Sequence, residues 1–314
     1  MGMSTYLITG GAGFIGSNIA QSLLGRGDKV RILDNFSTGK RENVAHLDGV
    51  ELVEGDIRDV EVVKEAVKGA DFCLHHAALP SVARSVENPV FSNEVNVSGT
   101  VNVLVAAVEA SVKRLVYASS SSVYGDSPTL PKREDMALRP LSPYAVSKLA
   151  GEFYVNSFRH VYGLNTIILR YFNVFGPRQD PKSKYAAVIP AFILAMSEKQ
   201  SPKIFGDGEQ SRDFTYVGNV VAANIAACHS PDSAIGGTYN IACGSRTTVN
   251  ELAKQIAEIL KCELEPQHVT PRPGDVRHSC ADISAARHEL GYEPQVGIKE
   301  GLAKTVEWLA SEHP

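Results

Sequence analysis

Residues 6–16 read Tyr6-Leu7-Ile8-Thr9-Gly10-Gly11-Ala12-Gly13-Phe14-Ile15-Gly16, and this stretch decides the fold. It begins as a short apolar strand, turns on glycines that tolerate positive φ, and continues into a helix with apolar residues at helical spacing. The pattern predicts the first strand–turn–helix unit of an α/β fold.

The glycine spacing also indicates a ligand. Gly11-x-Gly13-x-x-Gly16 and Gly10-x-x-Gly13-x-x-Gly16 are both typical of a turn that receives a dinucleotide pyrophosphate, because bare backbone and a helix N-terminus lie together there. The next predicted strand, 29–34, ends in Asp34, which can accept hydrogen bonds from ribose hydroxyls and would repel a 2′-phosphate. The motif therefore favours NAD over NADP. A ligand-free turn and a capping role for Asp34 are the alternatives.

Composition narrows the class of protein. The chain has 314 residues, 44% of them hydrophobic, and a net charge of −4. These values suit a soluble protein with a sizeable core and argue against a nucleic-acid partner. No apolar run is long enough to span a membrane, and a strand begins too early to leave room for a signal peptide. Five scattered cysteines and the absence of metal-ligand spacing predict a cytoplasmic protein with reduced thiols and no metal.

Strands and helices alternate through the first half of the chain. We predict strands over 50–53, 70–75, 114–118 and 164–169, and helices over 60–67, about 89–110, and from 142 through 158. This alternation predicts a Rossmann-type, doubly wound parallel sheet, whose ligands lie beyond the carboxyl ends of the strands. Asp56 could there reach adenine, and Asn96 could reach the cofactor or brace a loop. Turn chemistry is the alternative for each of these positions.

Tyr144 and Lys148 carry the chemistry that we expect. Ser142 and Pro143 suit a helix start, and the two reactive residues, four apart, share a face of that helix. A nearby ammonium favours the phenolate, so we expect the pKa of Tyr144 to be lowered and the phenol to act as a general base. Alone, this spacing more often marks a solvated helix face.

Four motifs together resemble one family. They are Gly10 to Gly16, Ser119 to Gly125, Ser142 to Lys148, and Arg170-Tyr171-Phe172-Asn173-Val174-Phe175-Gly176-Pro177. The chain resembles the extended short-chain dehydrogenase/reductases, and within them the nucleotide-sugar epimerases that act on UDP-hexoses and UDP-N-acetylhexosamines. The resemblance implies tightly held NAD, Tyr144 as base, Lys148 on the nicotinamide ribose, and Ser120 on the 4-oxygen of the sugar. It also implies 4-epimerisation through a 4-keto intermediate.

The expected contacts follow from these motifs and this resemblance. For the cofactor they are Gly10, Gly13, Phe14, Ile15, Gly16, Asp34, Asn35, Asp56, Ile57, Ala77, Ala78, Asn96, Tyr144, Lys148 and Tyr171. For the UDP-sugar they are Ser81, Ser120, Ser121, Ser122, Tyr144, Asn173, Gln179, Ala187, Arg212, Arg272, Asp275 and Ser279. The resemblance assigns a diphosphate clamp to Arg212 and Arg272, and the uridine ribose to Asp275.

Ser279 bears on the choice of hexose. Epimerases restricted to plain hexoses tend to carry tyrosine at the matching position, and serine leaves space for a 2-acetamido group. We therefore expect UDP-GlcNAc and UDP-GalNAc to react as well as UDP-glucose and UDP-galactose. A neutral loop residue is the alternative.

The resemblance also predicts the organisation of the chain. We expect an NAD-binding lobe over 1–170 plus about 213–236, a substrate lobe over 171–212 and 237–314, and a homodimer formed through the helices at 89–110 and 142–162. Dehydratases and decarboxylases are disfavoured because they carry acidic residues where Ser121 and Ser122 stand. A UDP-glucuronate 4-epimerase and a catalytically silent NAD-binding regulator stay open as alternatives.

Overall fold

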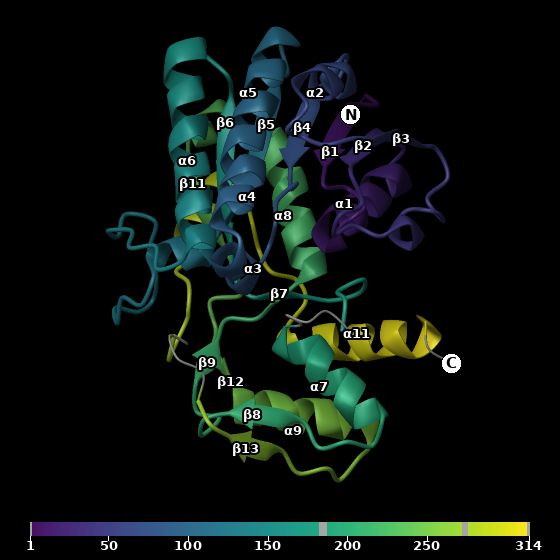
Figure 1. The fold of residues 1–314 in the computed structure, drawn as a ribbon, viewed down its shortest axis with the longest axis vertical. Helices are drawn as coiled ribbons and strands as arrows, with labels where there is room; N and C mark the ends of the chain where they lie inside the picture. The colour runs from purple at the N-terminus through teal and green to yellow at the C-terminus, as the bar shows by residue number, and fades with distance from the viewer. Residues whose placement is uncertain (1, 182–186, 272–275, 313–314) are drawn as a thin grey trace.

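The computed structural model describes residues 2–181, 187–271 and 276–312. A large parallel sheet with helices on both faces forms the upper part of Figure 1, and a smaller group of helices and short strands lies below the carboxyl ends of its strands. None of the helices in the described ranges is both long and apolar enough to cross a membrane.

The sheet has seven parallel strands in the order β11-β6-β5-β4-β1-β2-β3. Its strands are β1 (Thr5–Thr9), β2 (Lys29–Asp34), β3 (Val50–Glu54), β4 (Phe72–His75), β5 (Arg114–Ser120), β6 (Thr166–Tyr171) and β11 (Thr238–Ile241). The chain builds outward from β1 in one direction and then from β4 in the other. A crevice for ligands is therefore expected between the carboxyl ends of β1 and β4. The predicted fold class is confirmed.

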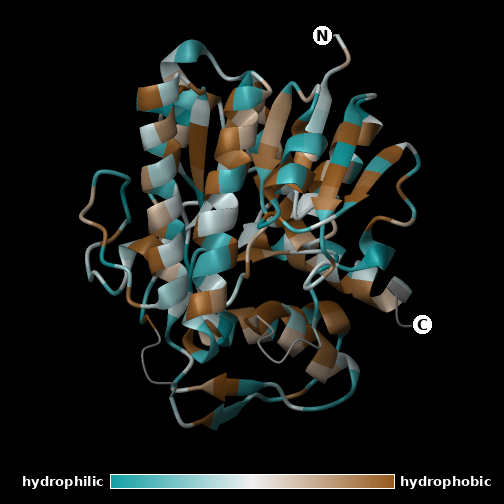
Figure 2. Cartoon of the chain, turned by 45° about the horizontal axis from the view of Figure 1, so that its top comes forward, coloured by the Kyte–Doolittle hydropathy of each residue, from teal (hydrophilic) through white to brown (hydrophobic). Residues whose placement is uncertain are grey.

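Burial explains why these segments form strands. Tyr6, Leu7 and Ile8 are fully buried because both faces of the sheet are covered. Tyr6 and Ile8 pack toward α1 (Phe14–Gly25) and α8 (Val217–His229), whereas Leu7 packs toward α2 (Val60–Val67), α5 (Gly99–Glu109) and α6 (Pro143–Tyr162). Figure 2 shows the hydrophobic colour concentrated along the central strands.

The predicted helix at 89–110 is present, with a change of winding inside it. It comprises α4 (Pro89–Asn93), a π-helical turn (Glu94–Ser98) and α5. Asn88 caps its start by accepting a hydrogen bond from the Phe91 N–H. The π-turn carries Asn96, and such turns are frequent at functional sites.

The helix that carries the reactive pair begins and ends as its sequence predicts. The Ser142 hydroxyl accepts a hydrogen bond from the Ala145 N–H (3.1 Å), and Pro143 occupies the first turn of α6. Gly163, with φ of 71°, ends the helix in the left-handed conformation. Short α3 (Val82–Glu87) packs beside it.

The smaller part surrounds a core of its own that includes Phe192, Leu252 and Leu302. Its helices are α7 (Val188–Ser197), α9 (Val249–Leu260) and α11 (Ile298–Glu312). Its paired strands are β7 (Val174–Phe175) with β10 (Thr215–Tyr216), β8 (Lys203–Phe205) with β13 (Gln267–Val269), and β9 (Ser211–Arg212) with β12 (Thr247–Thr248).

One predicted lobe boundary is wrong. Residues 237–314 were assigned to the substrate lobe, yet β11 is the edge strand of the large sheet and pairs with β6 along its length. α10 (Ser284–Leu290) also packs against the large core through Ala286 and Leu290. The last third of the chain crosses between the two parts more than once, and no local composition change marks those crossings. The remaining division into lobes stays a prediction.

Candidate active site

The glycine turn is packed against the end of β4. Gly10 has φ of 69°, and a Cβ there would lie 2.7 Å from the Ala77 nitrogen. A Cβ on Gly16 would lie 2.4 Å from the Gly10 carbonyl oxygen. No side chain in the described part of the chain caps the N-terminus of α1, and its first turn has no acidic residue. The cradle therefore fits a pyrophosphate, which would take the N–H groups and the positive end of the helix dipole.

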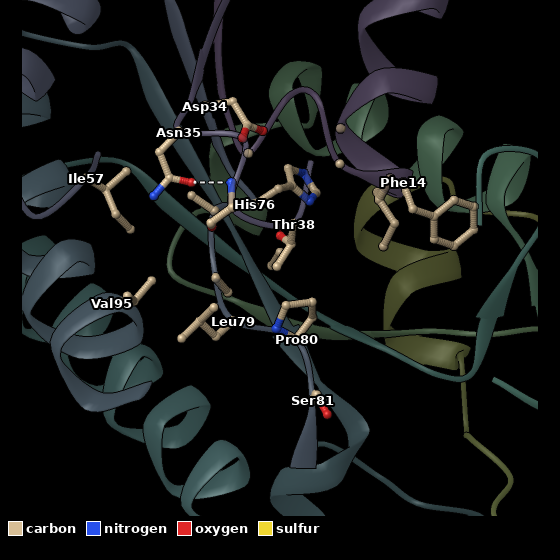
Figure 3. A pocket seen from close by; sticks show the side chains of 18 of the residues that line it. Phe14, Asp34, Asn35, Thr38, Ile57, His76, Leu79, Pro80, Ser81 and Val95 are labelled. Atoms are coloured by element: carbon tan, nitrogen blue, oxygen red, sulfur yellow. Dashed lines mark hydrogen bonds between the residues drawn. The ribbon is translucent and has the colours of Figure 1, made fainter. Parts of the chain in front are cut away.

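Asp34 lies at the end of β2, beside this turn. Its carboxylate accepts hydrogen bonds from the Ala12 N–H (2.9 Å) and the Phe36 N–H (2.8 Å). Burial raises its pKa, and these two hydrogen bonds oppose that shift. Figure 3 shows Asp34 and Asn35 on the same rim of the cavity. A buried carboxylate here fits ribose hydroxyls and opposes a phosphate.

Asp56 lies on the same rim. It accepts a hydrogen bond from the Asn35 side chain (2.7 Å) and is paired with Arg58. The Arg58 hydrogen bond lowers the pKa of Asp56 to about 2, so this carboxylate stays charged at neutral pH. It can accept the hydrogen bond from an adenine amino group that the sequence analysis assigned to it.

Tyr144 and Lys148 lie at the other end of the same cavity. The Tyr144 backbone N–H donates to the Ser85 hydroxyl (3.0 Å), which ties α6 to α3. The Lys148 ammonium donates to the Ala118 carbonyl oxygen (2.8 Å), and its nitrogen lies 5.1 Å from the centre of the Tyr117 ring. Burial lowers the pKa of Lys148 to about 8, and the charge of Glu152 partly opposes that shift.

The expected lowering of the Tyr144 pKa is wrong for the protein without ligands. Burial raises it, and the hydrogen bond with the Ser120 side chain is the one opposing cause. Ser120 ends β5, and its hydroxyl also accepts a hydrogen bond from the Ser122 N–H (3.2 Å). Sequence spacing places Lys148 near the phenol, but it does not reveal how strongly the site is desolvated.

A cavity of about 410 Å³ joins these groups. It is lined by most of the predicted contacts: Gly10, Gly13, Phe14, Ile15, Gly16, Asp34, Asn35, Asp56, Ile57, Ala77, Ala78, Ser81, Tyr144, Lys148, Tyr171, Gln179 and Ala187. Gln179 lines this cavity, and its buried Oε1 atom has no hydrogen-bond partner within the described ranges, as expected of a group that meets a ligand. Figure 3 shows Phe14, Ile57, Leu79 and Val95 as apolar parts of the wall.

A second cavity of about 280 Å³ adjoins the first, and Ala187 lines both. Asn173 and Arg212 line it together with aromatic residues that include Phe205 and Phe214. The Arg212 guanidinium donates to the backbone carbonyl oxygens of Ser211 and Arg277. The predicted contacts Arg272 and Asp275 lie outside the described residues.

Comparison with known proteins places the chain in a family. Residues 6–242 match the sequence profile of the NAD dependent epimerase/dehydratase family. The chain belongs to this family. Its cofactor is NAD, as the sequence analysis predicted, and the glycine cradle and Asp34 described above fit that cofactor.

Individual relatives support the same assignment. The UDP-glucose 4-epimerase of Mycolicibacterium smegmatis is 41% identical, over 98% of both chains. A UDP-N-acetylglucosamine 4-epimerase from Methanobrevibacter ruminantium M1, solved in complex with UDP-N-acetylmuramic acid, is 40% identical; the match has a TM-score of 0.95 and covers 99% of this chain and 100% of that one. The UDP-glucuronate 4-epimerase of Thermodesulfobacterium geofontis is 33% identical, over 98% of this chain and 96% of that one.

Among the described residues, five predicted contacts line neither cavity: Asn96, Ser120, Ser121, Ser122 and Ser279. Asn96 is buried and lines neither cavity: its carboxamide accepts from the Leu79 N–H (2.8 Å) and donates to the Ser147 hydroxyl (3.0 Å). Of its two expected roles, the structure shows loop bracing. Ser279 also lines neither cavity, but its N–H donates to the Ser211 carbonyl oxygen, which places it beside Arg212.

Some cavity residues were not foreseen. Ser37, Thr38 and Lys40 line the cofactor end, and Pro80 and Arg84 line the end near Tyr144. The first three come shortly after the strand that ends in Asp34. The tendency of ligands to bind beyond the carboxyl ends of parallel strands could therefore have identified them. Arg84 carries no such local signal, since α3 reaches the cavity through its packing on α6.

Proposed function

We propose that this protein is an NAD-dependent UDP-sugar 4-epimerase. One observation carries the proposal: the Tyr144–Lys148 pair and the glycine cradle line a single cavity, and a second cavity with Arg212 adjoins it. That arrangement would suit a dinucleotide in the first cavity and a second nucleotide in the adjoining one, with the reactive phenol within reach of both.

Each reactive side chain has a distinct part in the proposed chemistry. Tyr144 removes the proton of the sugar 4-hydroxyl, and the Ser120 hydroxyl holds the 4-oxygen. Lys148 binds the nicotinamide ribose, and its charge stabilises the phenolate. NAD, when bound, would supply the acceptor for the hydride of C4 and the donor that returns it. Between the two transfers the 4-keto sugar turns its other face to the cofactor, so Tyr144 gives the proton back to an inverted centre.

The second cavity suits the nucleotide part of the substrate. Its phenylalanines offer an apolar wall for a base, and the Arg212 guanidinium in the same wall is a group that suits a phosphate. The predicted partners Arg272 and Asp275 would complete the diphosphate and ribose contacts. These two roles are carried over from the family resemblance.

We further propose that the hexose site accepts an N-acetyl group. Ser279 and Ala187 are both small, and Ser279 follows the segment that pairs with β9. A 2-acetamido group therefore meets less bulk than a tyrosine at position 279 would present. UDP-GlcNAc and UDP-GalNAc are then substrates alongside UDP-glucose and UDP-galactose.

A panel of UDP-sugars with product analysis by NMR tests the function. We expect interconversion within the glucose/galactose and the N-acetylglucosamine/N-acetylgalactosamine pairs. Turnover of UDP-glucuronate alone would support the glucuronate alternative. NAD retention without turnover of any UDP-sugar would support the silent regulator and contradict the proposed function.

We also propose a cytoplasmic homodimer. Large apolar side chains are more than half exposed on α3, α4 and α6: Val86 (63%), Val90 (67%), Phe153 (63%) and Val161 (63%). These helices pack beside one another, so their exposed residues form a surface that a second copy can cover. All five cysteines are unpaired, as in a reducing compartment. Light scattering that finds a monomer would contradict the dimer.

A further inference from the structure

A buried ion pair lies one helical turn beyond Lys148. Arg170, on β6, donates two hydrogen bonds to the Glu152 carboxylate of α6, at 2.9 and 2.7 Å. The two side chains are only 5% and 4% exposed. Two parallel hydrogen bonds of this kind fix orientation as well as distance.

The same carboxylate binds the strand that carries the catalytic serine. The Ser119 hydroxyl donates to Glu152, and the preceding residue, Ala118, accepts the hydrogen bond of Lys148. Lys148 and Glu152 are four residues apart on α6, so they contact consecutive residues of β5 immediately before Ser120. These contacts set the register of α6 against the end of β5.

A chain of hydrogen bonds extends from Arg170 beyond the serine turn. Arg170 donates to the Tyr124 hydroxyl (2.9 Å), which donates to the Asn240 side chain on β11 (2.7 Å). Tyr124 closes the short helical turn Ser121–Tyr124 that follows Ser120. Each member is at least nine-tenths buried, and each has a partner.

Glu152 differs from the other titratable groups around Lys148 because it supplies a negative charge. His75, at the end of β4, and His76, which follows it, face the ammonium, but burial lowers the pKa of each far enough to keep both neutral at neutral pH. Tyr117 of β5 and Tyr144 of α6 have pKa values raised by burial, so both are also neutral. Arg170 of β6 is positive. Among the described residues, Glu152 supplies the negative charge that opposes the desolvation of Lys148.

We propose that the Glu152–Arg170 pair is a positioning element of the active site, which holds Lys148 in its charged form and holds the serine strand in register with α6. The proposal rests on the proposed function, because it concerns residues that serve that reaction. A buried ion pair is a weak source of stability, since apolar residues of similar volume often replace it without loss. The role of this ion pair is to fix the position of the Glu152 carboxylate.

Titration of Lys148 in the NAD-loaded protein tests the proposal. The lysine signals of ¹³C-lysine-labelled enzyme are followed by NMR, and the Lys148 signal is identified by its loss in Lys148→Met. In Glu152→Gln we expect the Lys148 midpoint to fall by roughly one pH unit, because the opposing charge is gone. The alkaline limb of the kcat profile should move by the same amount, so that kcat well above the midpoint falls roughly tenfold.

Tyr124→Phe is the matched control. It removes a hydrogen bond of Arg170 and lowers stability, but it leaves the Glu152 charge in place. We expect its Lys148 midpoint and alkaline limb to coincide with those of the wild type. If Glu152→Gln does not fold, Glu152→Met combined with Arg170→Met removes both charges together. A downward shift is still expected, but a smaller one, because the loss of the Arg170 charge opposes it.

An unchanged Lys148 midpoint and alkaline limb in the variant that lacks Glu152 would overturn the proposal, whatever its kcat. The same holds if Tyr124→Phe shifts both as much as Glu152→Gln does. Failure of the proposed function gives a different result. In that case the wild type converts no UDP-sugar, while the NMR midpoints still decide the role of Glu152.

Discussion

Replacing Lys148 with methionine should stabilise the protein while abolishing its activity. Lys148 is 5% exposed, and the pKa of its ammonium falls from 10.5 to about 8 on folding. That difference of 2.5 units corresponds to about 3.4 kcal/mol, at ~1.36 kcal/mol per unit. Methionine fills a similar volume without a charge, so Lys148→Met should raise the free energy of unfolding by about 3 kcal/mol at pH 7.

The stabilisation by Lys148→Met should decrease as the pH rises. Between about pH 8 and 10.5 the unfolded wild type binds a proton at Lys148 that the folded wild type has released. Wild-type stability therefore rises with pH across this window, and the variant lacks that rise. The advantage of Lys148→Met should shrink to about 1.4 kcal/mol at pH 9.5.

Urea denaturation of nucleotide-free protein at pH 7 and pH 9.5 measures this difference. Both proteins are compared at one concentration, because ligand and subunit binding shift apparent stability. Lys254→Met is the control: Lys254 is exposed on α9, so the change should stay within about 0.5 kcal/mol and show no such trend. The reasoning is refuted if Lys148→Met is less stable than the wild type at pH 7, or if its advantage does not change with pH.

Three further predictions concern the chemistry. Tyr144→Phe should lower kcat by at least ~100-fold without unfolding the protein, because it removes the base alone, and near-normal turnover in a rapid UDP-sugar assay would contradict that role. Denatured wild-type protein should release NAD, and chromatography that finds no nicotinamide nucleotide or only NADP would contradict the selectivity assigned to Asp34. Ser279→Tyr should suppress turnover of UDP-GlcNAc while sparing UDP-glucose, and a variant that keeps its activity toward the acetylated sugar would refute the pocket argument.

The parts of the fold that the sequence predicts are those with local signals. The glycine turn needs close backbone approach at Gly10 and Gly16, so its residues identify it wherever it occurs. Ser142, Pro143 and Gly163 likewise mark the ends of α6 within a few residues of chain. Ligands of parallel sheets lie beyond the carboxyl ends of the strands, and the sheet brings all those ends to one edge. The residues that follow each strand can therefore be predicted to surround the cavity.

The misses involve contacts between segments far apart in the chain. β11 joins the large sheet by pairing with β6, about 70 residues earlier in the chain. The sequence of β11 does not indicate which strand it pairs with. The Tyr144 pKa depends on burial by several elements, which the spacing to Lys148 does not report. Arg84 reaches the cavity through the packing of two helices. Tertiary packing decides all three.

The π-turn at Glu94–Ser98 limits the deletions that this segment can tolerate. A π-turn holds one residue more than an α-helical turn, so deleting a residue there would restore an uninterrupted α-helix. α4 and α5 would keep their faces, because either kind of turn completes one circuit of the helix, and the change would fall on the residues of the turn itself. Asn96 lies in that turn, so it would lose its alignment with Leu79 and Ser147. Surface loops can change length freely during evolution, whereas this helix must keep the additional residue of its π-turn.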